Sequence, residues 1–138
     1  MAILICSILL LDFYTADKLK EDKGLKNRIF ETINNAEKID FAEITDFYWE
    51  QMYIFTPYSI PRNILKEDGI KTVNSRFQIE ILDTINMIGF IDTNKLVAFV
   101  ELPRSFGGEN LLHFLKFSRE EAKFKISLDK KAIIFDSN

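Results

Sequence analysis

The sequence contains very few of the residues from which metal sites and disulfides are built. Its 138 residues include one cysteine, Cys6, and one histidine, His113. A single cysteine excludes a disulfide within the chain, and one histidine with one cysteine cannot form any of the common zinc ligand sets. The pair Gly107 and Gly108 lacks the lysine and the further glycine of a phosphate-binding loop. We therefore expect no metal and no cofactor.

A surplus of basic residues is absent as well. Lysine and arginine total 18 against 21 aspartates and glutamates, and the net charge is -3 with both signs scattered along the chain. A phosphate backbone requires a basic stripe, so the sequence disfavours nucleic acid as a partner. Proline and glycine are scarce, at three and five residues, whereas 13 phenylalanines contribute to a hydrophobic fraction of 47%. This balance is typical of an ordered globular domain with a large aromatic core.

The means for nucleophilic catalysis are also missing. His113 lies among apolar neighbours, which is typical of a packed histidine rather than a general base. Cys6 has apolar neighbours too, and such a setting raises the pKa of a thiol and lowers its reactivity. Adjacent acids such as Glu120 and Glu121 usually face water, although a glycosidase pair could lie among the carboxylates. We expect that the protein is not an enzyme; a hydrolase that uses carboxylates or His113 is the alternative.

The first residues combine the length of an export signal with the wrong flanking residues. Residues 2–11 are ten apolar or small residues in a row. As a helix they would be roughly 15 Å long, half of a bilayer core, so they do not span a membrane alone. No lysine or arginine precedes them, and Tyr14 is too bulky for its position before a cut at Ala16. We interpret residues 1–16 as a degraded or truncated signal or anchor segment; a buried first strand or helix is the alternative.

Residues 17–138 predict a single α+β domain. Leu25, Ile29 and Ile33 recur at helical spacing between residues 17 and 38. Further along, the pattern predicts a strand within 41–55, a short helix from Pro61 to Gly69, a strand at 77–81, a hairpin of 87–91 and 96–102, and strands at 124–128 and 132–135. We expect the N-terminal helix to pack on a mainly antiparallel meander sheet of about five or six strands, with a short helix after the first strand.

The most distinctive segment surrounds the single tryptophan. In the predicted strand one face would carry Phe47, Trp49, Tyr53 and Phe55. Pro57 and Tyr58 follow as a rigid corner. Because Trp and Tyr combine apolar area with a polar group, Trp49, Tyr53, Pro57 and Tyr58 are candidates for a binding surface. The alternative is that Trp49 anchors the core and that the corner fixes the connection between strand and helix.

Two arginines are further binding candidates. Arg62 follows Pro61 and Arg104 follows Pro103, so each stands at the edge of a predicted element. A guanidinium in such a position can bind an anion or a carboxylate. Pairing with the nearby acids Glu50 or Glu101 is the alternative.

Residues 44–59 resemble a family of small uncharacterised bacterial envelope proteins. The shared pattern is tryptophan, an acid, two variable positions, tyrosine, a hydrophobic residue, phenylalanine, one variable position, proline and tyrosine, and it runs here from Trp49 to Tyr58. The similarity continues through residues 85–90, 97–104 and 122–124. The resemblance implies a signal peptide or lipoprotein leader followed by a charged helix, display on or outside the cytoplasmic membrane, and no known activity.

Three functional hypotheses follow. The first is a non-enzymatic, envelope-associated binding protein whose partner is another protein, with membrane association through residues 1–16; the protein would be cytoplasmic if those residues belong to the fold. The second is an immunity or antitoxin-like protein that neutralises a partner toxin, because an acidic surface steers a protein to basic enzymes. The third is the hydrolase described above, which requires titratable groups that converge in a polar pocket.

Overall fold

The computed structural model describes residues 18–107 and 114–135, which form an α+β fold. The elements follow the chain in the order α2 (Lys23–Asn35), β1 (Lys38–Asp40), α3 (Phe41–Ile44), β2 (Gln51–Phe55), α4 (Pro61–Glu67), η1 (Gln78–Glu80), β3 (Ile85–Asp92), β4 (Lys95–Pro103), η2 (Arg104–Gly107), β5 (Leu115–Ser118), β6 (Lys123–Ile126) and β7 (Ile133–Ile134). The described strands form a four-stranded sheet of order β4-β3-β2-β5 and a three-stranded sheet of order β1-β6-β7. Neighbouring strands in both sheets are antiparallel.

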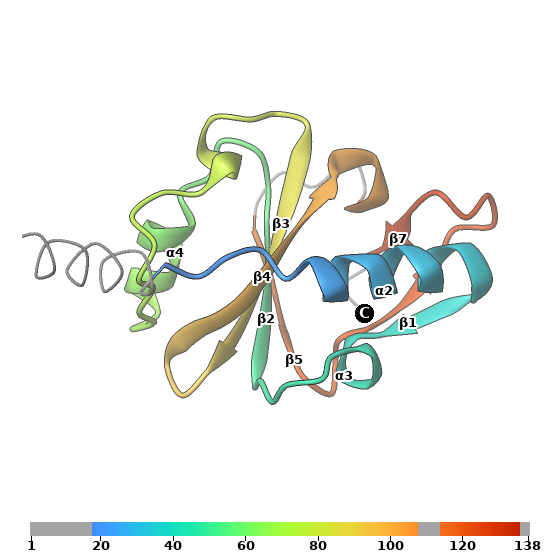
Figure 1. Cartoon of the computed structure of the whole chain (residues 1–138), viewed down its shortest axis with the longest axis horizontal. Helices are drawn as coiled ribbons and strands as arrows, with labels where there is room; N and C mark the ends of the chain where they lie inside the picture. Colours follow the sequence, from blue (N-terminus) through green and yellow to red (C-terminus); the bar gives the residue numbers. More distant parts are fainter. Residues whose placement is uncertain (1–17, 108–113, 136–138) are drawn as a thin grey trace, which may run out of the picture.

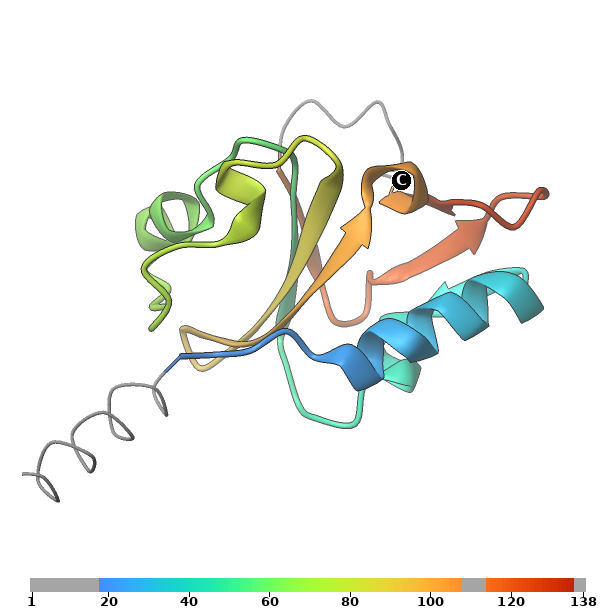
Figure 2. The same ribbon diagram turned by 45° about the horizontal axis from the view of Figure 1, so that its top comes forward.

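The four-stranded sheet is covered on both faces. On β2, Met52 and Ile54 belong to one hydrophobic cluster, whereas Tyr53 and Phe55 belong to another. Because side chains alternate across a strand, the two clusters lie on opposite faces of the sheet. Figures 1 and 2 show the resulting layers: α4 lies on one side of the sheet, and α2 with the three-stranded sheet lies on the other.

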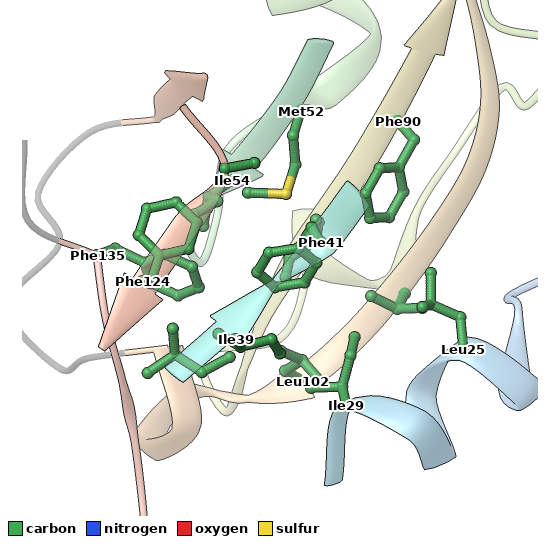
Figure 3. Packing of buried hydrophobic residues seen from close by; sticks show 14 of the residues in the cluster. Leu25, Ile29, Ile39, Phe41, Met52, Ile54, Phe90, Leu102, Phe124 and Phe135 are labelled. Carbon is green, nitrogen blue, oxygen red and sulfur yellow. The ribbon is translucent and has the colours of Figure 1, made fainter. Parts of the chain in front are cut away.

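The larger cluster joins α2 and the three-stranded sheet to the four-stranded sheet. Phe41, directly after β1, is fully buried, and its ring centroid lies 6.2 Å from that of Phe90 and 5.9 Å from that of Phe124. Figure 3 shows Phe41 in the middle of this cluster, with Ile39 and Met52 directed toward it from β1 and β2. Burial of each such side chain contributes about 1.5 to 3 kcal/mol, so this cluster is the main source of stability between the two sheets.

Helix α2 is capped by Asp22, whose Oδ1 accepts a hydrogen bond from the Leu25 amide at 2.9 Å. Its buried face is Leu25, Ile29 and Ile33, which confirms the spacing in the sequence. The helix is shorter than the interval from 17 to 38 because the preceding residues run along β4. The Asp22 amide donates to the Phe99 carbonyl at 3.0 Å, and these contacts cover an edge of the sheet that would otherwise be open.

The α+β class, the packing of the N-terminal helix on antiparallel strands and the short helix after the first strand are confirmed. The expected single meander is instead seven strands in two sheets among the described residues. The first sheet is separate because β1 pairs with β6, which lies more than eighty residues later in the chain, rather than with β2. Period-two patterns identify strands but do not identify such distant partners.

Two local predictions were wrong. Residues 77–81 form the turn of η1 rather than a strand: the Ile81 amide donates to the Gln78 carbonyl, and the Glu80 carboxylate accepts from the Phe77 amide at 2.7 Å. Trp49 precedes β2, and it belongs to the cluster of Met52 rather than to that of Tyr53. The tryptophan lies on the other face because residues 45–49 are not part of a strand, so strict alternation of side chains does not extend back to Trp49.

Candidate functional site

The strongest candidate for a binding site is a pocket beside α4, called the basic pocket below. Its volume is about 590 Å³, and its walls carry the cationic side chains of Arg62, Lys66, Lys71 and Lys95. No aspartate or glutamate among the described residues lines it. A chain with a net charge of -3 therefore gathers four positive groups around one cavity.

The end of α4 forms one wall of the basic pocket. Gly69 has a φ of +73°, a left-handed conformation that glycine adopts without strain, and it ends the helix as the sequence predicts. The Gly69 amide donates to the Lys66 carbonyl at 3.0 Å, and the Ile70 amide donates to the Leu65 carbonyl at 2.9 Å. These two bonds form a Schellman motif, which reverses the chain and places residues 70–73 beside the helix. Arg62 and Lys66 are four residues apart, so they share one face of α4.

The opposite wall forms where residues 70–73 meet the start of β4. The Lys71 amide donates to the Asn94 carbonyl, and the Lys71 carbonyl accepts from the Leu96 amide, each at 2.9 Å. These bonds make a parallel bridge between Lys71 and Lys95. Two lysines are thereby held on neighbouring backbone segments, and no carboxylate of the described part of the chain lines the pocket with them.

The floor of the basic pocket is apolar. Ile70 and Leu96 are 5% and 6% exposed and belong to the hydrophobic cluster under α4, whereas Val73 is 63% exposed. A cavity with an apolar floor and a cationic rim suits a ligand that has both an anionic group and a hydrocarbon part. The two parts would be recognised by different residues of the same site.

The first described residues are attached next to this pocket. The Asn74 side chain accepts from the Leu19 amide at 3.0 Å and donates to the Leu19 carbonyl at 2.9 Å. Asn74 is 9% exposed and directly follows Val73 of the pocket lining. This pair of bonds holds Leu19 beside the residue that follows Val73.

Two of the sequence-predicted binding residues lie in the core. Trp49 is fully buried, and its Nε1 donates to Thr45 Oγ1 at 2.8 Å. Tyr53 is buried in the cluster under α4, and its hydroxyl donates to Asp68 Oδ2 at 2.5 Å. Neither side chain offers the open surface that a binding role requires, and the alternative role of Trp49 as a core anchor fits its position.

The other four candidates do not form one site. Pro57 and Tyr58 form the corner before α4, where the Tyr58 amide donates to the Ile79 carbonyl at 2.9 Å and the side chain is 64% exposed. Arg62 lines the basic pocket, whereas Arg104 begins η2 beyond β4 and does not. Arg62 is therefore the one predicted residue that the pocket contains. The sequence analysis did not identify Lys66, Lys71 and Lys95 as binding residues. The spacing of four residues between Arg62 and Lys66, which places both on one face of a helix, could have indicated Lys66.

Two clusters of titratable groups bear on the hydrolase hypothesis. In the first, Lys116 Nζ lies 3.6 Å from Asp68 Oδ2, and burial, followed by the Asp68 hydrogen bond, raises the pKa of the Tyr53 hydroxyl above its ordinary value. A raised pKa makes the phenol a poorer nucleophile at neutral pH. In the second, Lys26 Nζ lies 3.3 Å from Glu21 Oε1. Neither cluster lines the basic pocket or the second pocket described below.

Glu101 in the second cluster makes stability depend on pH. Burial, and then the negative charge of Glu21, raise the pKa of the Glu101 carboxyl above 4.5, while Lys26 acts in the opposite direction. The folded state therefore holds this proton more tightly than the unfolded state, and the associated stability is lost as the pH rises through the folded pKa. We expect Glu101→Gln to raise the free energy of unfolding at pH 7 but not at pH 4, measured by urea denaturation.

Glu121 supplies a control for Glu101, because its pKa is shifted in the opposite direction. The Ser118 hydrogen bonds lower the pKa of the Glu121 carboxyl, so its stabilising effect is present above the ordinary value and is lost as the pH falls. Glu121→Gln should accordingly lower stability at pH 7. A Glu101→Gln variant with unchanged stability at pH 7 would contradict the role assigned to the buried carboxyl.

A second pocket, of about 510 Å³, lies on the three-stranded sheet. Lys38 stands opposite Lys125, and Asp40 stands opposite Lys123, on β1 and β6. Glu43 adds a further carboxylate to the lining. Because the carboxylates of Asp40 and Glu43 stand among the lysines here, this pocket attracts an anion less than the basic pocket does.

Some sequence predictions lie outside the described residues. Cys6, His113 and residues 1–16 are among them, so the packing expected for His113 and the leader interpretation stay predictions. Within residues 18–107 and 114–135, no helix combines the length and the apolar character needed to cross a bilayer. The same part of the chain contains no cluster of three histidine, cysteine or acidic side chains that could hold a metal ion.

Comparison with known proteins adds no further constraint. No protein-family model, curated protein or solved structure matches this chain. The resemblance of residues 44–59 to bacterial envelope proteins stays a prediction. The functional argument therefore depends on the geometry and charge of the pockets.

Proposed function

We propose that this protein is a non-enzymatic binding protein associated with the cell envelope, and that the basic pocket is its binding site. The observation that carries the proposal is the gathering of four cations around an apolar floor, with no carboxylate from residues 18–107 or 114–135 in the lining. The ligand accordingly carries a negative group together with a hydrocarbon part. The apolar run of residues 2–11 and the resemblance to envelope proteins support the location.

The pocket is built on backbone that is already fixed. The Schellman motif holds Lys66 at the end of α4, and the bridge to β4 holds Lys71 beside Lys95. A rim of this kind requires little reorganisation when an anion enters, so less of the binding free energy is lost in ordering the site. The long lysine stems can also lie along the apolar floor while their ammonium groups face the ligand.

Titration of the folded full chain with anilinonaphthalene sulfonate, a fluorescent dye with apolar rings and a sulfonate, tests this proposal. We expect Lys66→Gln/Lys71→Gln to weaken dye binding at least about tenfold, because charge-assisted contacts contribute about 1.5 to 3 kcal/mol each. The matched control is Lys38→Gln/Lys125→Gln, which changes the net charge equally but lies at the second pocket. Circular dichroism of each variant verifies that the dye reports the folded state.

Equal loss of dye binding in the two double variants would contradict the proposal, because it would show that the dye responds to net charge rather than to the basic pocket. Absence of dye binding to the folded wild-type chain would do the same. Dye binding that depends on Lys66 and Lys71 alone would support a dedicated anion site.

A second candidate function, neutralisation of a basic partner protein, is favoured by the loop before β2. Tyr48 is 64% exposed there, next to the fully buried Trp49, and the Arg119 guanidinium carbon lies 5.5 Å from its ring centroid. Asp46 and Glu50 are exposed on either side of it. An exposed tyrosine with a buried neighbour and with two acids close to it in the sequence suits an interface with a basic protein. In this function the partner contacts the loop and not the basic pocket.

A further inference from the structure

We propose that the basic pocket binds an acidic segment of another protein, in which aliphatic side chains stand between several carboxylates. This inference rests on the proposed function and names the partner of the same site. The carboxylates of the segment meet the cationic rim, and its aliphatic side chains meet the buried Ile70 and Leu96 of the floor and the exposed Val73. One partner thereby uses both parts of the pocket.

The number and placement of the cations indicate a ligand with several negative charges. Helix α4 carries Arg62 and Lys66, and the segment after the helix carries Lys71. The fourth cation, Lys95, is the first residue of β4. A single anionic group neutralises one of these four charges, and the other three continue to repel one another. Carboxylates that are spread along a peptide can instead pair with cations that come from separate segments of the chain.

The remainder of the lining distinguishes a peptide from a nucleotide, which also combines several negative charges with an apolar part. No phenylalanine, tyrosine or tryptophan of residues 18–107 and 114–135 lines the basic pocket. Proteins commonly hold unpaired bases by stacking them on aromatic rings, and this lining offers no such ring. Aliphatic side chains of a peptide, by contrast, pack directly against Ile70 and Leu96. The lining therefore favours an acidic peptide.

An exposed tyrosine before α4 adds a further apolar contact outside the pocket. Residues 56–59 have the features of a type II turn: the second residue is proline, and the Ser59 amide donates to the Thr56 carbonyl at 3.2 Å. The third residue, Tyr58, has a φ of +64°, which favours glycine and strains a tyrosine. Its side chain is 64% exposed, and Ile60 at the start of α4 is 42% exposed. A strained backbone that displays an aromatic ring suits a contact surface for a partner larger than the pocket.

The test uses fluorescence anisotropy of a fluorescein-labelled synthetic peptide, in which leucines alternate with pairs of glutamates, titrated with the folded full chain. Substitution of any one of the four cations should weaken peptide binding about tenfold, because each substitution removes one charge-assisted contact. Substitution of two should weaken it at least about 100-fold, a larger loss than for the dye, which has a single charge. The single variants are Arg62→Gln, Lys66→Gln, Lys71→Gln and Lys95→Gln, and the double variant is Lys66→Gln/Lys71→Gln.

Two control peptides separate the contribution of the rim from that of the floor. In the first, glutamines replace the glutamates, and in the second, serines replace the leucines. Each should bind the wild type at least about tenfold more weakly than the parent peptide, because the first loses the charge-assisted contacts and the second loses the buried apolar area. Lys38→Gln/Lys125→Gln is the protein control of equal charge and should bind the parent peptide as the wild type does.

Tyr58→Gly tests the contact outside the pocket without endangering the fold, because glycine adopts this φ without strain. The variant should bind the parent peptide about fivefold more weakly, as expected for loss of an aromatic contact in an interface. Dye binding should not change, since Tyr58 does not line the basic pocket. Unchanged peptide binding in Tyr58→Gly would overturn the part of the inference that extends the surface beyond the pocket.

Equal peptide binding by the wild type and Lys66→Gln/Lys71→Gln would overturn the inference, and so would failure of the wild type to bind the peptide. If that double variant nevertheless lost dye binding, the pocket would be a site for a small apolar anion, and the proposed function would stand without the acidic partner. If neither dye binding nor peptide binding changed, both proposals would fail. Equal weakening by the control variant would show that net charge attracts the peptide, which also overturns the assignment to the pocket.

Discussion

Replacement of Trp49 by alanine is expected to lower the free energy of unfolding by about 3 to 5 kcal/mol. The side chain is fully buried, its ring centroid lies 5.1 Å from that of Phe90, and the Arg119 guanidinium carbon lies 5.0 Å from it on another side. Removal of the indole would leave a cavity and would also leave Thr45 Oγ1 without its donor. Arg119 donates to the Trp49 and Ala42 carbonyls, so the loss would extend to the contact between the two sheets.

Urea denaturation followed by far-ultraviolet circular dichroism measures this effect, because the variant lacks the single tryptophan as a fluorophore. Trp49→Phe is the conservative variant: it keeps most of the apolar volume and should cost less than the alanine variant. Tyr48→Ala is the matched control, since its neighbouring ring is exposed and should change stability by about 1 kcal/mol or less. If Trp49→Ala unfolded at the same urea concentration as the wild type, the tryptophan would not anchor the core.

Replacement of Asn86 by an apolar residue is expected to raise the free energy of unfolding, whereas replacement of Trp49 by alanine lowers it. It is 2% exposed on β3, and neither side-chain polar atom has a hydrogen-bond partner among the residues that the structure describes. An unsatisfied buried amide costs about 1 to 3 kcal/mol. Asn86→Leu, which keeps the branching of the side chain, should therefore raise the free energy of unfolding by about 1 kcal/mol. Asn86→Asp should lower it by about 3 kcal/mol or more, because the substitution places a charged carboxylate in a buried position where the described residues offer the present side chain no hydrogen bond.

Urea denaturation at neutral pH measures the free energy of unfolding of Asn86→Leu and Asn86→Asp, and the prediction is that the two change in opposite directions. Gly107 limits the space: a Cβ built at this glycine would lie 2.6 Å from Asn86 Nδ2. Asn86→Ala controls for volume, since it removes the amide and leaves a gap. Should Asn86→Leu prove less stable than Asn86→Ala, overpacking against Gly107 would outweigh the gain, and Asn86→Val would then be the variant that tests the amide itself. A destabilised valine variant would show that the amide contributes to stability.

Substitution of the lysines of the basic pocket is expected to change ligand binding far more than the free energy of unfolding. Lys66, Lys71 and Lys95 are exposed, and substitution of exposed residues away from caps and networks usually changes stability by less than about 0.5 kcal/mol. Four cations around one cavity repel one another, so neutralisation of two of them relieves rather than creates strain. Loss of binding in the double lysine variant can therefore be separated from loss of fold.

The sequence by itself determined the local elements of this protein. Helical spacing identified the buried face of α2, glycine at position 69 marked the end of α4, and the turn residues at 92–95 located the hairpin of β3 and β4. Each of these signals acts over a few residues, where backbone geometry and alternation of side chains are decided locally. The absence of a recognisable metal or nucleophile motif was also visible in the composition.

Only the tertiary structure decided which surface carries the candidate site. Lys71 and Lys95 are separated along the chain by η1 and β3, and they meet because the Lys71 backbone bonds to Asn94 and Leu96. Tertiary packing also put Trp49 and Tyr53 into the core, where the sequence had left both a binding surface and a core position open for Trp49. Aromatic side chains serve cores and interfaces equally well, and burial is settled by which segments pack against them. A pocket whose walls come from distant segments exists only after those segments have paired.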